Sequence, residues 1–271
     1  MIRLALRCPP ELAERVLAEL VELAPGGVEE ERGTSYVEYA VYGAPGELPA
    51  LPDLTALAGD GEIEVSSEEI PDDWADRWRD FHRPVVVGDR LTVRPSWEAS
   101  SPAGEIAITI DPGRAFGTGA HATTRMCLEL LLGLADSGEA SGRLADLGTG
   151  SGVLAIAAAK LGFAPVLACD HETAALEAAA ENAALNGVEL DLRRVNLREE
   201  AAPVADTVAA NLTAPILREV ATRFADPPER MICSGLLRRE VDEVAGALSA
   251  RGLAERRRLT DGDWMALLVT R

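Results

Sequence analysis

Residues 146–152, with the sequence Asp-Leu-Gly-Thr-Gly-Ser-Gly, constrain the fold more than any other segment of this chain. Gly148 allows a sharp turn at the end of a strand, and the next two glycines leave room for a ligand and a closely packed helix. That helix is predicted to begin near residue 151 and to offer unpaired N–H groups to an anion. Asp170 follows one helix and one strand later, where a carboxylate can bind a ribose. The spacing predicts an α/β fold with a site for an adenosine cofactor.

The position of the third glycine separates two classes of cofactor. The nicotinamide and flavin fingerprint, Gly-x-Gly-x-x-Gly, needs glycine at position 153, where this chain has Val153. The spacing Gly-x-Gly-x-Gly, with Asp146 two residues before it, resembles instead the class I S-adenosylmethionine methyltransferases. In that class Asp170 would accept hydrogen bonds from both ribose hydroxyls. A nicotinamide-dependent oxidoreductase and an ordinary strand-to-helix turn are the alternatives.

The net charge of the chain limits which macromolecules it is expected to bind. Its 271 residues are 47% apolar, enough for two domains with sizeable cores, and carry a net charge of −19. Such acidity disfavours direct binding to nucleic acid, whose phosphates it would repel. Residues 1–69 hold 15 Asp or Glu against four Arg and no Lys, which is more than half of the negative excess. That surface would attract a basic macromolecule, although the same charge can serve solubility alone.

Cysteine and histidine are few and scattered. No zinc-type spacing exists among Cys8, Cys127, Cys169, Cys233, His82, His121 and His171, so no metal is expected. We also expect a cytoplasmic protein without a membrane segment, because neither a leader nor an apolar run of membrane-spanning length is present. We expect the protein to be a monomer.

The order of predicted elements divides the chain into three parts. Residues 1–69 contain β-α-β-β-α-β, typical of a small ferredoxin-like α+β domain that serves recognition, with strands or helices at 2–8, 10–23, 28–31, 35–41, 48–57 and 62–67. Residues 70–83 form a helical linker, and residues 84–271 form the catalytic domain.

Three aromatic side chains mark the linker. Trp74, Trp78 and Phe81 share one helical face at i, i+4 and i+7. This face either packs one domain onto the other or lines the entrance to the active site.

The catalytic domain alternates helices with apolar strands, which predicts a mainly parallel sheet with helices on both faces. Three strands, at 84–87, 90–95 and 105–110, precede the glycine-rich loop. The sheet strands are predicted at 143–147, 165–169, 190–195, 207–211, 230–234, 255–259 and 264–269. Seven strands that end in a hairpin fit a Rossmann-like methyltransferase sheet better than a dehydrogenase.

A second glycine-rich segment, residues 111–124, precedes this sheet. Its three closely spaced glycines and its two threonines predict a loop that leads into a capped helix at 123–134. Such a loop could cover a bound cofactor and exclude water, or could be a surface loop with a threonine cap.

A polar residue, Asn211, ends the fourth sheet strand at the edge where open α/β sheets bind ligands. Its amide either contacts the reacting nitrogen or the methionine end of the cofactor, or it caps the helix predicted at 213–224.

Four motifs together resemble one family. They are Asp-Pro-Gly-x-Ala-Phe-Gly-Thr-Gly-x-His-x-Thr-Thr at 111–124, Asp-Leu-Gly-Thr-Gly-Ser-Gly-Val-Leu-Ala-Ile at 146–156, Asn-Leu-x-Ala at 211–214 and Ser-Gly-Leu-Leu at 234–237. This set resembles the bacterial methyltransferases of large-subunit ribosomal protein eleven. The resemblance covers most of residues 70–271, and over residues 1–69 it is one of size and element order.

The resemblance implies a basic ribosomal protein as substrate, gripped by the N-terminal domain and methylated on lysine side chains and an N-terminal amine. It assigns S-adenosylmethionine contacts to Phe116, Gly117, Thr118, Thr124, Asp146, Gly148, Gly150, Asp170 and Asn211. The chain departs from the family after the ribose acid, where Asp-x-Asp-Pro is replaced by Asp-His-Glu-Thr at 170–173. The contacts on the adenine side are therefore left open.

The chemistry of the reactants assigns the catalytic role. A sulfonium methyl is already activated, so the enzyme must chiefly align a neutral amine with it. We assign Asn211 that positioning role. His121 is a proton acceptor or a structural residue of its loop.

Competing hypotheses are a lysine methyltransferase of another protein, such as the electron-transfer flavoprotein β subunit, the oxidoreductase mentioned above, and a non-catalytic assembly protein. The enzymes of the flavoprotein largely lack the N-terminal domain.

Overall fold

The computed structural model describes residues 2–13, 16–17, 20, 28–33, 35–43, 63–69, 83–98, 106–111, 119–203 and 205–271. Contacts divide the chain between Phe81 and His82 into two compact units. Several predictions fall outside the described residues: the helix at 48–57, the linker aromatics Trp74, Trp78 and Phe81, and the loop residues Phe116, Gly117 and Thr118. In the described part of the chain no helix is long and apolar enough to span a membrane.

The first unit is built on an antiparallel sheet with the strand order β2-β3-β1-β4. The strands are β1 (Ile2–Cys8), β2 (Glu29–Arg32), β3 (Val37–Gly43) and β4 (Glu64–Glu69), and a short 3-10 helix, η1, covers Pro10–Leu12. Apolar side chains at alternate positions, such as Leu4, Leu6 and Tyr39, form the core on one face. A first strand between the third and the fourth is the order that a ferredoxin-like β-α-β-β-α-β chain gives, so the strands agree with the prediction.

The second unit contains a seven-stranded sheet with the order β10-β9-β8-β11-β12-β14-β13. Its strands are β8 (Leu144–Leu147), β9 (Val166–Asp170), β10 (Asp191–Arg194), β11 (Thr207–Asn211), β12 (Arg230–Leu237), β13 (Ala254–Asp261) and β14 (Trp264–Thr270). The first five run parallel, and β13 and β14 form the closing antiparallel hairpin. All seven predicted strands are confirmed, with small shifts of their ends.

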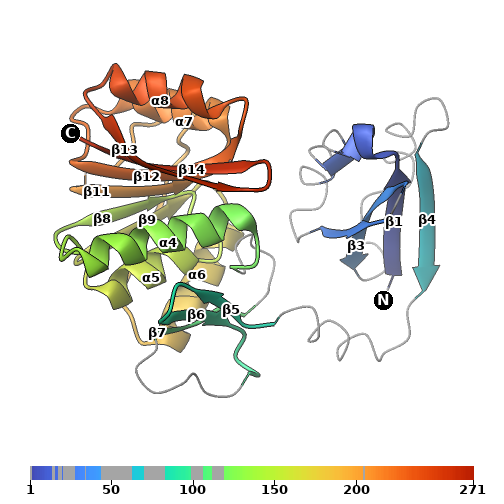
Figure 1. Cartoon of the computed structure of the whole chain (residues 1–271). Helices are drawn as coiled ribbons and strands as arrows, with labels where there is room; N and C mark the ends of the chain where they lie inside the picture. The colour runs from blue at the N-terminus through green and yellow to red at the C-terminus, as the bar shows by residue number, and fades with distance from the viewer. Residues whose placement is uncertain are drawn as a thin grey trace. The chain divides into compact units, whose positions relative to one another are not determined.

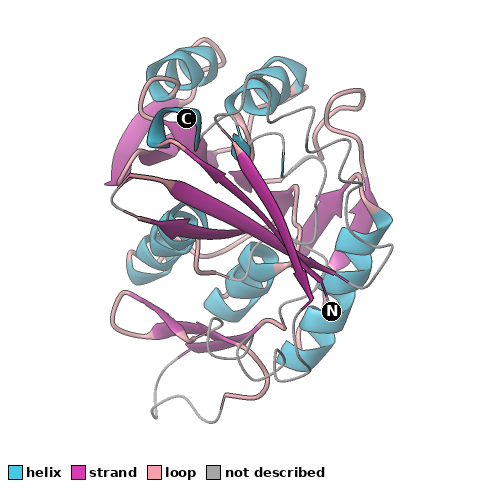
Figure 2. Ribbon diagram, turned by 90° about the vertical axis from the view of Figure 1, so that its right-hand side faces the viewer, coloured by secondary structure: helices cyan, strands magenta, loops and turns pink. Residues whose placement is uncertain are grey.

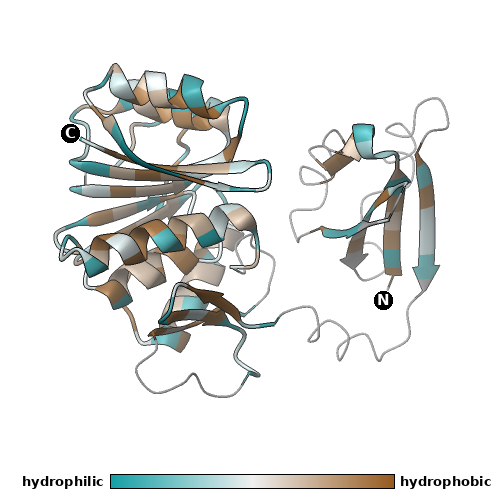
Figure 3. Cartoon of the chain, in the orientation of Figure 1, coloured by the Kyte–Doolittle hydropathy of each residue, from teal (hydrophilic) through white to brown (hydrophobic). Residues whose placement is uncertain are grey.

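Helices cover both faces of this sheet, as Figures 1 and 2 show. They are α4 (Ala122–Asp136), α5 (Val153–Leu161), α6 (Thr173–Asn186), α7 (Ala214–Arg223) and α8 (Val241–Ser249). Figure 1 shows α7 and α8 on one side and α4, α5 and α6 on the other. Figure 3 shows both apolar and polar residues along α4 and α8, which is expected of helices with one buried face.

A small sheet of three strands packs on the α4–α6 layer. It consists of β5 (Val85–Val87), β6 (Leu91–Arg94) and β7 (Ile106–Thr109), in the order β5-β6-β7. Strand β7 contacts α5 and α6, and β5 contacts α4. Buried residues such as Leu91 and Ile108 join the core that these helices share with the large sheet.

A bulge in β12 makes room for the chain that leaves β11. The pairing of β12 with β14 shifts register between Cys233 and Leu236. Gly235 has φ +84°, and a Cβ atom there would lie 2.4 Å from the carbonyl oxygen of Leu212. Because Leu212 follows Asn211, this glycine allows the candidate site segment to pass next to β12.

Replacing Gly235 with alanine should therefore lower the free energy of unfolding by more than the backbone strain at a positive φ would by itself. Gly252 is a matched control, because it also has φ +84° but has nothing within 4 Å of the added Cβ. We expect Gly252→Ala to lower the free energy of unfolding by about 1 kcal/mol, and Gly235→Ala by roughly 3 kcal/mol, in urea denaturation. Equal losses would mean that the close approach of Leu212 costs nothing.

Candidate functional site

The glycine-rich loop after β8 is tied to the neighbouring strand. The N–H groups of Gly148 and Thr149 both donate to the carbonyl oxygen of Cys169 in β9, at 2.8 and 2.9 Å. Gly148 has φ +72°, and a Cβ atom there would lie 2.5 Å from Cδ2 of Leu212. The predicted sharp turn is thus present, and it lies against the segment that follows β11.

The carboxylate of Asp146 occupies the start of α5. Its Oδ2 accepts hydrogen bonds from Oγ1 of Thr149 at 2.7 Å and from the N–H of Ala155 at 3.2 Å. The N–H of Val153, the first residue of α5, lies 3.4 Å from Oγ of Ser151. The prediction that this helix begins near residue 151 is confirmed, because α5 begins at Val153 with Gly152 as its N-cap residue. Two of its first N–H groups, those of Val153 and Ala155, already have side-chain acceptors within the protein, and for Ala155 the acceptor is Asp146.

Asp146 is almost fully buried, with 1% of its surface exposed. Burial raises the pKa of its carboxyl to about 7, although the hydrogen bonds from Thr149 and Ala155 act in the opposite direction. Its second oxygen, Oδ1, is buried and has no hydrogen-bond partner among the described residues. One oxygen of Asp146 thus holds the loop, and its other oxygen is a buried acceptor without a partner among the described residues.

The predicted ribose acid, Asp170, ends β9 beside this loop. Its Oδ2 accepts from the N–H of Gly150 at 3.1 Å, and its Oδ1 accepts from the N–H of Glu172 at 3.1 Å. Nδ1 of His171 lies 3.2 Å from the same Oδ1. A carboxylate offers about four lone-pair sites, so Asp170 can hold the loop and still accept from ribose hydroxyls.

The amide of Asn211 reaches the first turn of α4. Its Nδ2 donates to Oγ1 of Thr123 at 3.1 Å and of Thr124 at 3.3 Å, and both threonines are buried. Thr213, not Asn211, is the N-cap residue of α7, and no side chain caps that helix by a hydrogen bond. The alternative that Asn211 merely caps α7 is therefore wrong.

His121 is the N-cap residue of α4, a role that the sequence had given to a threonine. Its Nδ1 accepts from the N–H of Thr123 at 3.4 Å and lies 2.7 Å from Oγ1 of the same residue. The imidazole also meets the ring of Trp264 edge-on, at 5.0 Å between centroids. The threonines lie inside the helix, which leaves their hydroxyls available to Asn211.

The structure brings together five predicted site residues: Thr124, Gly148, Gly150, Asp170 and Asn211, with Asp146 beneath the loop. The loop residues Phe116, Gly117 and Thr118 stay predictions, because they lie outside the described residues. Sequence analysis did not assign roles to Thr123 or Gly235, although both belong to motifs that it singled out. Asn182, which contacts Ser151, gave no motif signal.

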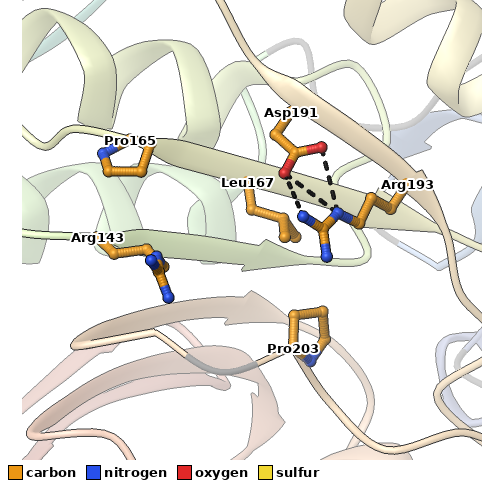
Figure 4. Close-up of a pocket in the computed structure, with 6 residues that line it drawn as sticks. All are labelled: Arg143, Pro165, Leu167, Asp191, Arg193 and Pro203. Carbon is orange, nitrogen blue, oxygen red and sulfur yellow. Dashed lines mark hydrogen bonds and ion pairs between the residues drawn. The ribbon is translucent and has the colours of Figure 1, made fainter.

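A separate cavity of about 420 Å³ lies away from these residues (Figure 4). It is lined by Arg143, Pro165, Leu167, Asp191, Arg193 and Pro203. Arg143 and Pro165 precede β8 and β9, whereas the glycine-rich loop and Asp170 follow or end these strands. The cavity is therefore at the opposite end of the strands and is not the cofactor site.

The sheet order, the glycine-rich loop and the acid at the end of β9 define a class I S-adenosylmethionine-dependent methyltransferase. The model of the family described as "Ribosomal protein L11 methyltransferase (PrmA)" matches residues 50–271. The chain belongs to this family.

Individual proteins with the same description are similar to this chain in sequence or structure. A ribosomal protein L11 methyltransferase of Symbiobacterium thermophilum is 43% identical over 73% of this chain and 66% of its own length. One of Pelotomaculum thermopropionicum is 35% identical over 98% of this chain and 97% of its own length. A crystal structure of the ribosomal protein L11 methylase of Lactobacillus delbrueckii subsp. bulgaricus, 31% identical, has a TM-score of 0.62 and covers 70% of this chain and 99% of that protein.

The raised pKa of Asp146 gives a prediction for stability against pH. The folded pKa of about 7 exceeds the ordinary value of 3.8, so the folded protein keeps a proton that the unfolded chain releases between these values. The stabilisation is full below about pH 4 and is lost as pH rises to about 7. In Asp146→Asn, whose side chain can accept the same two hydrogen bonds, this loss should be absent.

We expect the free energy of unfolding of the native protein to fall relative to Asp146→Asn by up to about 4 kcal/mol between pH 4 and pH 8. Urea denaturation of both proteins across this range measures the difference, and other titrating groups cancel in the comparison. A difference that stays constant with pH would show that Asp146 ionises normally in the folded state.

Proposed function

We propose that this protein transfers methyl groups from S-adenosylmethionine to amino groups of ribosomal protein L11. The observation that carries the proposal is the orientation of Asn211. Its NH2 group is engaged by Thr123 and Thr124, while its carbonyl oxygen accepts no hydrogen bond from any residue that the structure describes. An acceptor held in this way, beside the glycine-rich loop, suits an N–H donor such as a substrate amine.

The charges of the site fit S-adenosylmethionine. Residues 146–156 contain no Lys, Arg or His, and the carboxylate of Asp170 lies at the end of β9 beside the loop, while Asp146 is buried beneath it. A dinucleotide would bring a pyrophosphate to the start of α5, where Asp146 already accepts from Ala155. A cofactor with a sulfonium and an ammonium group is attracted to the carboxylate of Asp170 and meets no cation in this segment. This donor set disfavours the nicotinamide-dependent alternative.

When bound, the cofactor supplies an activated sulfonium methyl. The residues of the protein then have to position a neutral amine, because a lysine has an ordinary pKa near 10.4 and is mostly protonated at pH 7. Partial burial and a nearby positive charge both lower that pKa. The carbonyl oxygen of Asn211 accepts from the amine and directs its lone pair, while Thr123 and Thr124 fix the orientation of the amide. The contacts of His121 serve the cap of α4, and its part in proton transfer is an additional hypothesis.

The first unit carries exposed acidic side chains that would attract a basic ribosomal protein. Both edge strands carry glutamates, with Glu30 and Glu31 exposed on β2 and Glu64 and Glu68 exposed on β4. Two of the four arginines of residues 1–69, Arg3 and Arg7, pair with one glutamate, Glu38. Charged edges also prevent sheets from pairing with one another. These features support residues 1–69 as the substrate-recognition domain; residues 70–83 as its linker and residues 84–271 as the catalytic domain complete the proposed division.

Glu38, which is buried, binds both arginines. Arg3 Nη2 lies 2.5 Å from its Oε1, and Arg7 Nη2 lies 2.7 Å from its Oε2. The hydrogen bond from Arg3 is the main cause that lowers the pKa of Glu38. Residues 1–69 hold 15 acidic residues against four arginines, and two of these arginines share Glu38, so the net negative charge of the domain favours a basic protein partner over nucleic acid. We propose that the protein acts as a cytoplasmic monomer.

Methyl transfer is tested directly with tritiated S-adenosylmethionine. We expect label in ribosomal protein L11, free or in ribosomal subunits from the same cell, and mass mapping should place it on lysine side chains or the N-terminal amine. Label in another protein would favour a different lysine methyltransferase. Label in RNA, or binding without turnover, would contradict the proposal.

The role of Asn211 is tested by Asn211→Ala. Loss of the positioned acceptor should lower kcat by about 100-fold, with a smaller effect on the binding of S-adenosylmethionine. Thr213→Ala is a matched control in the same segment, because Thr213 is exposed and makes no side-chain cap, and it should keep full activity. Full methyl transfer by Asn211→Ala would remove Asn211 from the reaction.

A further inference from the structure

A buried asparagine of α6 joins the two segments on which the site is built. Asn182 has 3% of its surface exposed. Its Nδ2 donates to the carbonyl oxygen of Ser151 at 2.8 Å, and its Oδ1 accepts from the N–H of Asp111 at 3.1 Å. Ser151 belongs to the glycine-rich loop, and Asp111 is the first residue of the 111–124 motif. One side chain therefore bridges segments that lie 31 and 71 residues away in the sequence.

A buried asparagine in a helix destabilises the folded protein unless its side-chain hydrogen bonds are made. Asparagine is a weak helix former, and a buried amide without partners loses its hydration. Here both ends of the amide are engaged by backbone groups, so the side chain has one orientation. Moving either partner would leave a buried donor or acceptor unsatisfied, which makes the spacing between α6, the loop and Asp111 specific.

The loop is held to α6 at a second point one turn earlier. A Cβ atom on Gly152 would lie 3.1 Å from Cα of Ala179, so the backbone of the loop packs directly on the helix. Gly150, on the other side of Ser151, donates its N–H to Asp170 at 3.1 Å. Asn182 thus acts on the stretch of loop between its contact with α6 and its contact with the ribose acid.

Asp111 is also held from a second direction. Its Oδ1 accepts from the N–H of Ser96 at 2.7 Å, just after β6. Strand β7, which leads into Asp111, packs against α6 and α5, and Figure 1 shows β7 next to these helices. The start of the 111–124 motif is therefore placed relative to the glycine-rich loop through α6.

We propose that Asn182 is a positioning residue of the cofactor site, which acts through Ser151 and Asp111 and not by a contact of its own. The proposal rests on the assignment of S-adenosylmethionine as the cofactor. Asn182 fixes the glycine-rich loop and Asp111 in the arrangement that the cofactor binds, so its loss weakens binding beyond any loss of stability.

Asn186 offers a matched control on the same face of α6, one turn later. Its Oδ1 accepts from the N–H of Thr109 at 2.9 Å, and its Nδ2 donates to the carbonyl oxygen of Thr109 at 2.6 Å. Its Nδ2 also donates to the backbone carbonyl oxygen of Asn182 at 2.8 Å. Asn186 therefore ties α6 to the end of β7, two residues before the Asp111 that Asn182 binds, and no hydrogen bond joins it to the described residues of the glycine-rich loop.

The experiment compares Asn182→Ala, Asn186→Ala and the native full-length chain. Calorimetric titration with S-adenosylmethionine, and with its demethylated product, gives Kd without relying on activity. We expect Asn182→Ala to raise Kd about tenfold or more, and Asn186→Ala to change it less than about twofold, although both variants lower Tm. Hydrogen exchange at the amides of Gly150 and Gly152 in the cofactor-free protein should accelerate in Asn182→Ala only.

A third variant separates positioning from failure to fold. Asn182→Asp keeps the size of the side chain and the acceptor for Asp111, but it places an oxygen against the carbonyl oxygen of Ser151. It should weaken cofactor binding at least as much as Asn182→Ala. Native affinity in both Asn182 variants, or equal weakening in Asn186→Ala, would overturn the proposal. Absence of binding by the native chain would instead contradict the cofactor assignment.

Discussion

The buried carboxylate of Asp146 is the interaction on which the rest of the site depends. It joins the end of β8 to the first turn of α5 by accepting from Thr149 and Ala155. Burial of a carboxylate is unfavourable, and these bonds compensate part of the cost. Because the buried carboxyl group of Asp146 already accepts from the N–H of Ala155, a pyrophosphate at the start of α5 would meet an acceptor there. This is the physical difference between the loop and a phosphate-binding turn.

The site combines segments that are distant in the sequence. Parallel strands place the loop after β8, Asp170 at the end of β9 and Asn211 at the end of β11 along one edge of the sheet. The first turn of α4 then meets that edge, so that Thr123 and Thr124 can hold the amide of Asn211. Orientation of a single amide thus depends on the packing of a helix on a sheet.

Much of the fold could be predicted because its signals are local. The apolar runs of β8, β9 and β11, and the glycines with positive φ at 148, 150 and 152, each specify structure over a few residues. Predictions about hydrogen-bond partners were less successful. The sequence offered threonines as caps for α4, but His121 takes that position, because the threonines turn inward to Asn211. A local cap signal could not reveal a partner 88 residues away.

The sequence by itself determined the seven-stranded sheet, the sharp turn at Gly148 and the acid one strand later, since periodicity and backbone conformation act along the chain. Only the tertiary structure decided which groups satisfy the start of α5, which way the amide of Asn211 points, and which atoms Gly235 and Asn182 meet. These outcomes depend on atoms brought within hydrogen-bond or van der Waals distance by packing between elements. A buried polar group takes the partner that the packed structure provides, and that partner is not encoded in its neighbours along the chain.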